Sequence, residues 1–128
     1  MKLEQQVTSL NLSKRLKKLG VKQESYIVWF YNGIEWALIR ELSILMGVDI
    51  LEKMPRMYSA FTVAELGELL PEQRYWTTVK TNTGSWRCSE YDENGLAEGG
   101  KTSFIADTEA EARGLMLACI IEHKLLGV

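Results

Sequence analysis

The stretch DTEAEARGLMLACIIEHKLLGV, from Asp107 to Val128, decides the fold. Thr108 and Glu111 have the spacing of a capping box, in which a hydroxyl and a carboxylate each accept a hydrogen bond from a backbone N–H of the first helical turn. Gly127 can supply the left-handed conformation that ends a helix. The stretch therefore predicts a helix that begins at Thr108 and stops before Gly127.

When successive residues are turned by about 100°, as in an α-helix, the apolar residues of this stretch fall on two broadly opposed sides. One stripe holds Ala112, Leu115, Cys119 and Leu126, and the other holds Leu117, Ala118, Ile121 and Leu125. Each stripe has to be shielded from water. We therefore expect the helix to lie across a sheet and to be covered on its outer side by a further helix or a long loop.

A first hairpin is predicted upstream. The run YIVWFY, Tyr26–Tyr31, consists almost wholly of β-branched and aromatic residues and is followed by Asn32-Gly33, a strong hairpin signal. A returning strand is expected at about 34–39. Both faces of the run are apolar, which is typical of a strand that is covered on both sides in the centre of a sheet.

A second hairpin is expected from residues 74–80 and 86–91, joined by a loop in which Gly84 permits a positive φ. If the loop spans 81–85, cross-strand neighbours follow directly. The expected pairs are Lys80 with Trp86, Thr78 with Cys88, and Trp76 with Glu90. One face of this hairpin should meet the C-terminal helix.

Two shorter helices complete the prediction. Ser9 can cap a helix that runs to about Leu19, with Gly20 as its left-handed terminator. A second capping box, formed by Thr62 and Glu65, precedes a helix over 63–70.

Residues 40–57 favour a strand followed by an irregular loop, although a helical turn fits them as well. Together the patterns predict the α+β class: an antiparallel sheet of two hairpins packed against a C-terminal helix, with two shorter helices. The 128 residues, 46% hydrophobic and 25% charged, fit one globular domain over 1–128.

Charge and cysteine content exclude several classes of protein. Lys and Arg total 15 against 17 Asp and Glu, so no overall attraction to nucleic acid or anionic lipid exists, and any such binding would be local. Cys88 and Cys119 lack metal-ligand spacing and are expected to be free, buried thiols. No apolar run is long enough to cross a bilayer, so we expect a cytoplasmic protein without membrane contact.

Catalytic signals are weak. The one histidine, His123, stands near a helix end, and no Ser or Cys has an evident base in a suggestive pattern. The string GLAEGGKT, Gly95–Thr102, formally fits a phosphate-binding loop. Such a loop needs a buried strand before it and a helix after it, whereas acidic, turn-like residues precede this string and an extended apolar stretch follows it. We therefore expect no enzymatic activity, no cofactor and no metal.

All four tryptophans fall on expected strands, where packing accounts for most of them. Interfaces between proteins favour Trp, Tyr and Arg, so the function that we favour is a non-enzymatic protein-interaction module. The partner would be another protein or a second copy of this chain. The candidate contact residues are Arg74, Trp76, Lys80 and Trp86.

The helix over 9–19 offers an alternative function, because its outer face carries Lys14, Arg15, Lys17 and Lys18. A solvated face with cations near a helix C-terminus explains these residues. They also suit phosphate binding, which would make the chain a small nucleic-acid-binding regulator whose affinity falls with salt.

Three stretches together resemble a set of small uncharacterised proteins encoded in bacteriophages and prophage regions. These stretches are SLNLSKRLKKLGVKQES (Ser9–Ser25), YSAFTVAELGELLP (Tyr58–Pro71) and TEAEARGLMLACIIEHKLL (Thr108–Leu126). The resemblance implies an accessory protein in a phage setting. It implies no mechanism, because no activity is assigned to that family.

The stretch LSKRLKKLGVKQESYIVWFYNG, Leu12–Gly33, is also similar to the helix-turn-helix of phage-repressor-like proteins. That resemblance implies a recognition helix that starts near Gln23 and enters the major groove of DNA. The residues argue against it, because YIVWFY has little helix propensity and no polar face that could read base edges.

Overall fold

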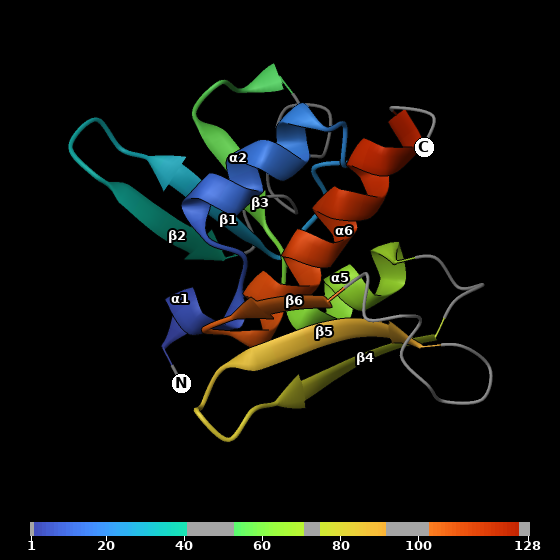
Figure 1. Cartoon of the computed structure of the whole chain (residues 1–128). Coiled ribbons are helices and arrows are strands. Elements are labelled where there is room, and N and C mark those ends of the chain that lie inside the picture. Colours follow the sequence, from blue (N-terminus) through green and yellow to red (C-terminus); the bar gives the residue numbers. More distant parts are fainter. Residues whose placement is uncertain (1, 41–52, 71–74, 92–102, 126–128) are drawn as a thin grey trace.

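The computed structural model describes residues 2–40, 53–70, 75–91 and 103–125, and it confirms the α+β class (Figure 1). The described strands form two three-stranded antiparallel sheets. Each predicted hairpin supplies two strands of one sheet, and a third strand joins each pair. The expected single sheet of two hairpins is therefore divided in two.

The first sheet has the order β2-β1-β3, with β1 (Ile27–Tyr31) between β2 (Trp36–Arg40) and β3 (Met57–Ala60). The prediction that the YIVWFY strand is central is confirmed. One face packs Ile27 with Val7 and Ala60, and the other packs Val28 with Met57. The strand β3 was not predicted, because its four residues carry too little alternation to be told from a loop.

The hairpin between β1 and β2 has a longer loop than its sequence suggests. Tyr31 pairs with Trp36, so residues 32–35 form the connection and β2 begins at Trp36 instead of about residue 34. The Asn32 side chain accepts hydrogen bonds from the N–H groups of Ile34 (2.9 Å) and Glu35 (3.0 Å). Gly33 has a φ of +100°, as the Asn-Gly signal requires. The asparagine side chain thus builds a wider turn than the two-residue form.

The second sheet has the order β4-β5-β6, with β4 (Tyr75–Lys80), β5 (Trp86–Tyr91) and β6 (Ser103–Ala106). The predicted register between β4 and β5 is confirmed at the pairs of Lys80 with Trp86, Thr78 with Cys88, and Trp76 with Glu90. Gly84 has a φ of +88° in the connecting loop.

The helix α6 (Glu109–Leu125) lies across the second sheet, and α5 (Val63–Leu69) and α2 (Leu10–Lys18) pack against it on other sides (Figure 1). The expected double covering of the C-terminal helix is confirmed. The largest core cluster draws on α2, α5, α6 and β5, and it includes Leu16, Leu66, Cys88 and Met116, all essentially without exposed surface.

Helix caps follow the sequence with one exception. Thr62 and Glu65 form the complete capping box of α5, and Ser9 Oγ accepts a hydrogen bond from Leu12 N–H at the start of α2. At α6, Thr108 Oγ1 accepts from Glu111 N–H at 3.1 Å, but the Glu111 carboxylate does not return to Thr108. It binds Ser9 instead, accepting from the N–H at 2.8 Å and from the hydroxyl at 2.7 Å. The predicted box is thus half formed, because a distant N-cap competes for the carboxylate.

A buried crossing ties the segment before α2 to the segment after β3. Val7 and Thr62 form an antiparallel bridge. Thr8 N–H donates to the Phe61 carbonyl at 3.0 Å, and Phe61 N–H donates to Thr8 Oγ1 at 3.1 Å. The Trp29 indole N–H donates to the Thr8 carbonyl at 3.0 Å. Both Thr8 and Phe61 are buried, so these bonds are shielded from water.

The short helix α1 (Leu3–Gln6) precedes this crossing. No described helix is both long and apolar enough to span a bilayer.

Candidate functional site

The four basic residues singled out on α2 occupy different environments. Leu12, Ser13 and Leu16 form the buried face of the helix, and the cations lie on the remaining surface. Arg15 pairs with Glu122 of α6 at 2.7 Å, and both side chains are about 40% exposed. Arg15 is therefore a surface link between two helices, an arrangement that contributes little to stability.

Lys17 is held against the first sheet. Its ammonium group donates hydrogen bonds to the carbonyls of Met54 at 2.7 Å and Met57 at 3.0 Å. It also lies 5.2 Å from the centre of the Tyr58 ring. Lys17 thus links α2 to the start of β3 through the two carbonyls and the Tyr58 ring.

Three aromatic rings lie beside these cations, at the end of the first sheet that carries the β1–β2 loop. The ring centres of Tyr31 and Trp36 are 5.3 Å apart, and those of Trp36 and Tyr58 are 5.8 Å apart. The rings are tilted by 46° and 43°, so no two of them stack face to face. Cross-strand pairing positions the first two, because Tyr31 and Trp36 face each other across the hairpin.

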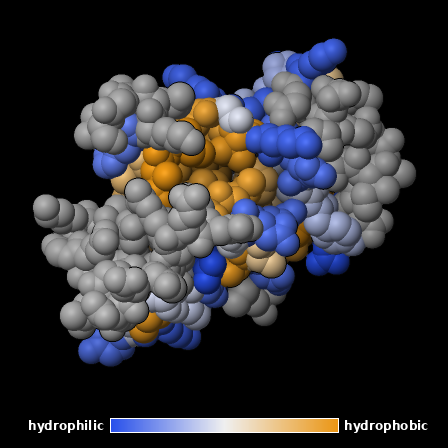
Figure 2. Space-filling view, turned by 90° about the vertical axis from the view of Figure 1, so that its right-hand side faces the viewer, coloured by the Kyte–Doolittle hydropathy of each residue, from blue (hydrophilic) through white to orange (hydrophobic). Residues whose placement is uncertain are grey.

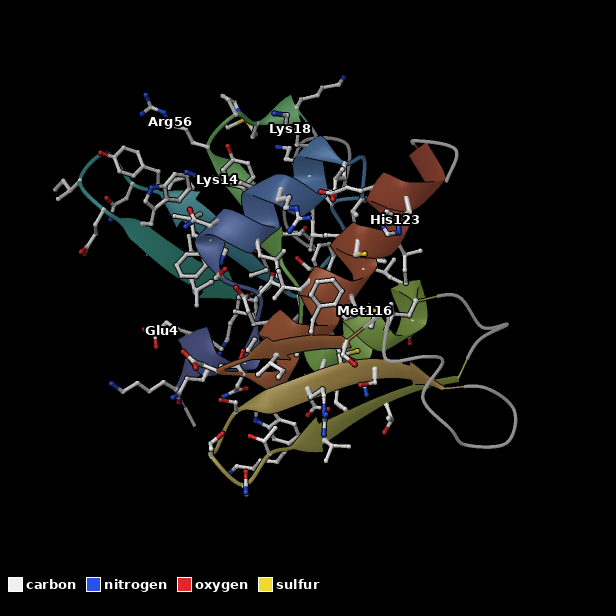
Figure 3. The ribbon with its side chains drawn as sticks, in the orientation of Figure 1. Glu4, Lys14, Lys18, Arg56, Met116 and His123 are labelled. Atoms are coloured by element: carbon white, nitrogen blue, oxygen red, sulfur yellow. The ribbon has the colours of Figure 1, made fainter. Side chains whose placement is uncertain are left out.

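Each of these rings has a cation over its face. Lys14 lies 4.9 Å from the centre of Trp36 and 5.8 Å from that of Tyr58, and Arg56 lies 5.3 Å from the centre of Tyr31. Cations are attracted to the negative face of an aromatic ring at such distances. Figure 3 shows Lys14 and Arg56 beside these rings, with Lys18 farther along α2 on the same side of the molecule.

We call this region the basic–aromatic surface. It is composed of Lys14, Lys17, Lys18, Arg56, Tyr31, Trp36 and Tyr58.

Charge is unevenly divided along the chain. Residues 1–57 contain nine Lys and Arg against six Asp and Glu, whereas residues 58–128 contain six against eleven. The part of the sequence that supplies nearly all of the basic–aromatic surface is therefore positive within an acidic protein. The net charge of −2 conceals this difference.

The sequence analysis found the lysines of this surface and missed its other half. Arg56 and Tyr58 stand in and just after the stretch whose structure was left undecided. Tyr31 and Trp36 were assigned to packing. The expected returning strand from about residue 34 would not pair Tyr31 with Trp36; only the observed loop over 32–35 brings these two residues opposite each other.

The residues expected to contact a protein partner are only partly brought together. Arg74 lies outside the described residues, and Trp76 is placed in β4 by its backbone pairing with Glu90. Lys80 and Trp86 are a cross-strand pair, with Lys80 exposed and Trp86 partly buried against the main core.

Lys80 and Trp86 lie on the face of the second sheet that turns toward α6, as does the buried Cys88. On the opposite face, Val79, Arg87 and Ile105 form a cross-strand row in which Ile105 is 62% exposed, whereas Ser89 on the same face is buried. Of Lys80 and Trp86 on the face toward α6, Trp86 is thus used in packing, whereas Lys80 is exposed.

The end of this face opens into a cavity of about 540 Å³ beside α1 and the start of α5. Lys80, Trp86, Val63 and Ala64 contribute to its wall, together with residues 107–109 before and in the first turn of α6. Lys80 and Trp86 therefore meet at the wall of this cavity.

A polar cluster crosslinks β4 and α6 in the same region. The Thr78 hydroxyl donates to the Glu109 carboxylate, and Arg113 Nη2 donates to Thr78 Oγ1 at 3.2 Å. Burial raises the pKa of the neighbouring Cys88 thiol from its ordinary 9.0 to about 11, with Arg113 lowering it and Glu109 raising it. Cys88 is thus a neutral thiol near pH 7, and thiols in that form are poor nucleophiles.

The second cysteine has a neighbour that its sequence spacing could have indicated. Cys119 Sγ lies 3.9 Å from His123 Nδ1, one helical turn farther along α6. Among the described residues no third group orients the imidazole, and no three His, Cys, Asp or Glu side chains are arranged to hold a metal ion. The pair lacks the orienting partner found in cysteine hydrolases.

Residues 12–33 do not form a helix-turn-helix. Gly20 ends α2 with a φ of +92°, and Val21 N–H returns to the Leu16 carbonyl at 3.0 Å. Where a recognition helix would lie, the chain forms strand β1. The β-branched and aromatic residues of that run explain the difference.

Figure 2 shows the face on the side of α5 and the C-terminal half of α6, where hydrophobic side chains gather at the centre and hydrophilic ones surround them. Leu19, Ile120 and Ile121 are partly buried and pack against the main core.

Comparisons with protein-family models, with curated proteins and with solved structures find no match for this chain. The resemblance to phage-encoded proteins therefore stays a prediction.

Proposed function

We propose that the chain binds nucleic acid through the basic–aromatic surface. The observation that carries the proposal is the row of three rings with Lys14, Lys17 and Arg56 over their faces. Cations attract the phosphate backbone, and aromatic rings offer faces to bases. This combination favours the alternative function over the protein-interaction module, because Trp86, one of the expected contact residues, packs against the core.

Binding is local rather than global. Lys14 and Lys18 are exposed, and neither forms an ion pair with any residue that the structure describes. Arg15 is paired with Glu122, and Lys17 donates to backbone carbonyls. These two side chains therefore hold α2 in position and are not assigned to phosphate contacts. Phosphate contacts are therefore assigned to Lys14, Lys18 and Arg56.

The test is fluorescence anisotropy with a labelled oligonucleotide at salt concentrations of about 50 to 200 mM. The double variant Lys14→Glu/Lys18→Glu should bind at least about tenfold more weakly, and the dependence of log affinity on log salt should flatten by about one to two. The matched control is Lys80→Glu/Arg87→Glu, which makes the same charge change at two exposed positions of the other sheet. Equal losses in both variants would reduce the effect to net charge and refute the assigned surface.

Protein binding at the cavity beside Lys80 and Trp86 is a second candidate function. The cavity of about 540 Å³ is large enough for an apolar side chain of a partner, and Lys80 at its wall could pair with an acidic neighbour. Peptides selected from a random library on the wild-type protein should lose binding to Ala64→Trp, which fills the cavity from an exposed position. They should keep binding to Glu68→Trp, one turn farther along α5 and outside the lining residues.

A further inference from the structure

We infer that the nucleic acid is single-stranded and that its bases stack on Tyr31 and Trp36 after displacing Arg56 and Lys14 from the ring faces, while Lys17 stays over Tyr58. This inference rests on the proposed function and deepens it. It specifies that the nucleic acid is unpaired and that cations cover the ring faces in the free protein.

The geometry of the rings favours unpaired bases. The centres of Tyr31 and Trp36 are 5.3 Å apart, and their tilt of 46° leaves each ring with a separate face. Bases within a duplex already stack on one another, so their faces are closed to a protein side chain unless the duplex opens. A single strand can present one base face to each ring in turn.

Among the described residues, no element at this surface is suited to duplex readout. The basic helix α2 has Leu12 and Leu16 buried against the core, so its inner face is fixed. The segment that follows it leads into the strand β1, so residues 19–31 supply no second helix that could enter a major groove. The surface can therefore recognise phosphates with its cations and unpaired bases with the faces of its rings.

Lys14 and Lys17 differ in how firmly they are held. Lys17 is fixed by the carbonyls of Met54 and Met57. Lys14 is exposed, and the ring faces of Trp36 and Tyr58 are the contacts that hold it among the described residues. Arg56 is likewise exposed and lies over Tyr31. Lys14 and Arg56 can therefore leave the rings while Lys17 keeps α2 in place.

Exchange of a cation for a base is favourable on general grounds. Stacking of a base on an aromatic side chain is stronger than an exposed cation–π contact. The displaced ammonium or guanidinium group then lies next to the nucleotide that displaced it, where it can bind the phosphate. In the free protein the same cations cover the ring faces, which keeps the row of rings ordered and shielded.

The decisive experiment uses the wild-type protein and needs no variant. Anisotropy titrations compare oligothymidylate of about 15 nucleotides, a duplex of the same length, and an abasic phosphodiester strand with the same charge. The single strand should bind at least about tenfold more tightly than the abasic strand, because each stacked base adds to affinity. Oligouridylate of equal length distinguishes RNA from DNA as the source of the bases.

Three variants locate the effect. Trp36→Ala should abolish most of the preference for the base-containing strand, whereas Lys14→Gln should lower the salt dependence and keep that preference. Trp36→Phe retains a ring and should retain the preference, which separates stacking from any loss of fold in Trp36→Ala.

The outcomes separate the two proposals. If the abasic strand or the duplex binds as tightly as the single strand, base stacking is wrong and nucleic-acid binding stands. If none of the strands binds in a salt-dependent manner, both proposals are wrong.

Discussion

Gly114 shows how closely α6 approaches the N-terminal segment. A Cβ atom at this position would lie 2.6 Å from Leu12 Cδ2 and 2.9 Å from Thr8 Cγ2, both closer than van der Waals contact allows. Only glycine fits there without movement of its neighbours, even though glycine is a poor helix former.

Gly114→Ala should therefore lower the free energy of unfolding by about 1–3 kcal/mol, because overpacking outweighs the gain in helix propensity. Gly67→Ala is the matched control. Its Cβ would meet only the flexible end of Arg113, at 3.3 Å, and the change should be neutral or stabilising by up to about 1 kcal/mol. Urea unfolding measures both variants. A Gly114→Ala protein as stable as the wild type would contradict this close approach.

Cys88 gives the chain a predictable response to alkaline pH. The folded thiol has a pKa of about 11 because it is buried, whereas the unfolded thiol titrates near 9.0. The group's contribution to stability is complete below pH 9, falls as the unfolded chain loses its proton first, and is gone above pH 11.

The free energy of unfolding should therefore fall more steeply between about pH 9 and 11 in the wild type than in Cys88→Ala. Tyr and Lys titrations occur in both proteins and cancel in the comparison. Urea midpoints measured across this pH range check the difference, and parallel profiles for the two proteins would refute it.

At the scale of helices, Glu111 joins two N-caps that lie far apart in the sequence. Its carboxylate accepts two hydrogen bonds from Ser9, whose hydroxyl also accepts from Leu12 N–H. The start of α6 and the start of α2 therefore share one partly buried carboxylate.

Glu111→Ala should cost about 1.5–3 kcal/mol, because it removes charge-assisted bonds and leaves a backbone N–H unsatisfied. Glu122→Ala removes an exposed ion pair with Arg15 on the same helix and should cost less than about 1 kcal/mol. Thermal or urea unfolding gives both values. Similar losses in the two variants would show that the link to Ser9 contributes no more than a surface pair.

Local signals predicted the elements where the residues that decide them are neighbours in sequence. The α5 capping box, the Ser9 cap and the register around Gly84 are cases of this kind. The predictions failed where a distant residue competes, as Ser9 does for Glu111. They also failed where a side chain widens a turn, as Asn32 does.

The candidate site was half predictable for the same reason. A run of lysines on one helix face is visible in the sequence, but the rings come from three different strands. Their meeting depends on the pairing of β3 with β1, which joins residues about 30 positions apart. A short stretch of sequence contains no signal for a pairing between such distant residues.

At the scale of the whole molecule, α6 is the element to which most others pack. It contacts the strands of the second sheet as well as α1, α2 and α5. Amide hydrogens of Met116, Leu117 and Ala118, which are buried, should exchange with deuterium only through global unfolding. Those of the loop at 32–35 should exchange within the first time points of a mass-spectrometric time course. Rapid exchange in the middle of α6 would contradict its central position.

The crossing of Thr8 and Phe61 has a consequence for how the gene could be divided. The first twenty residues belong to both halves of the molecule, because α2 packs on β3 and also on α6. A fragment that ended after β3 would contain α2 without α6, on which α2 packs. The remaining fragment would expose to water the side of α6 that α2 covers in the whole chain. Two separately produced fragments would therefore have to associate before either could fold. The two parts of the chain are expected to fold together.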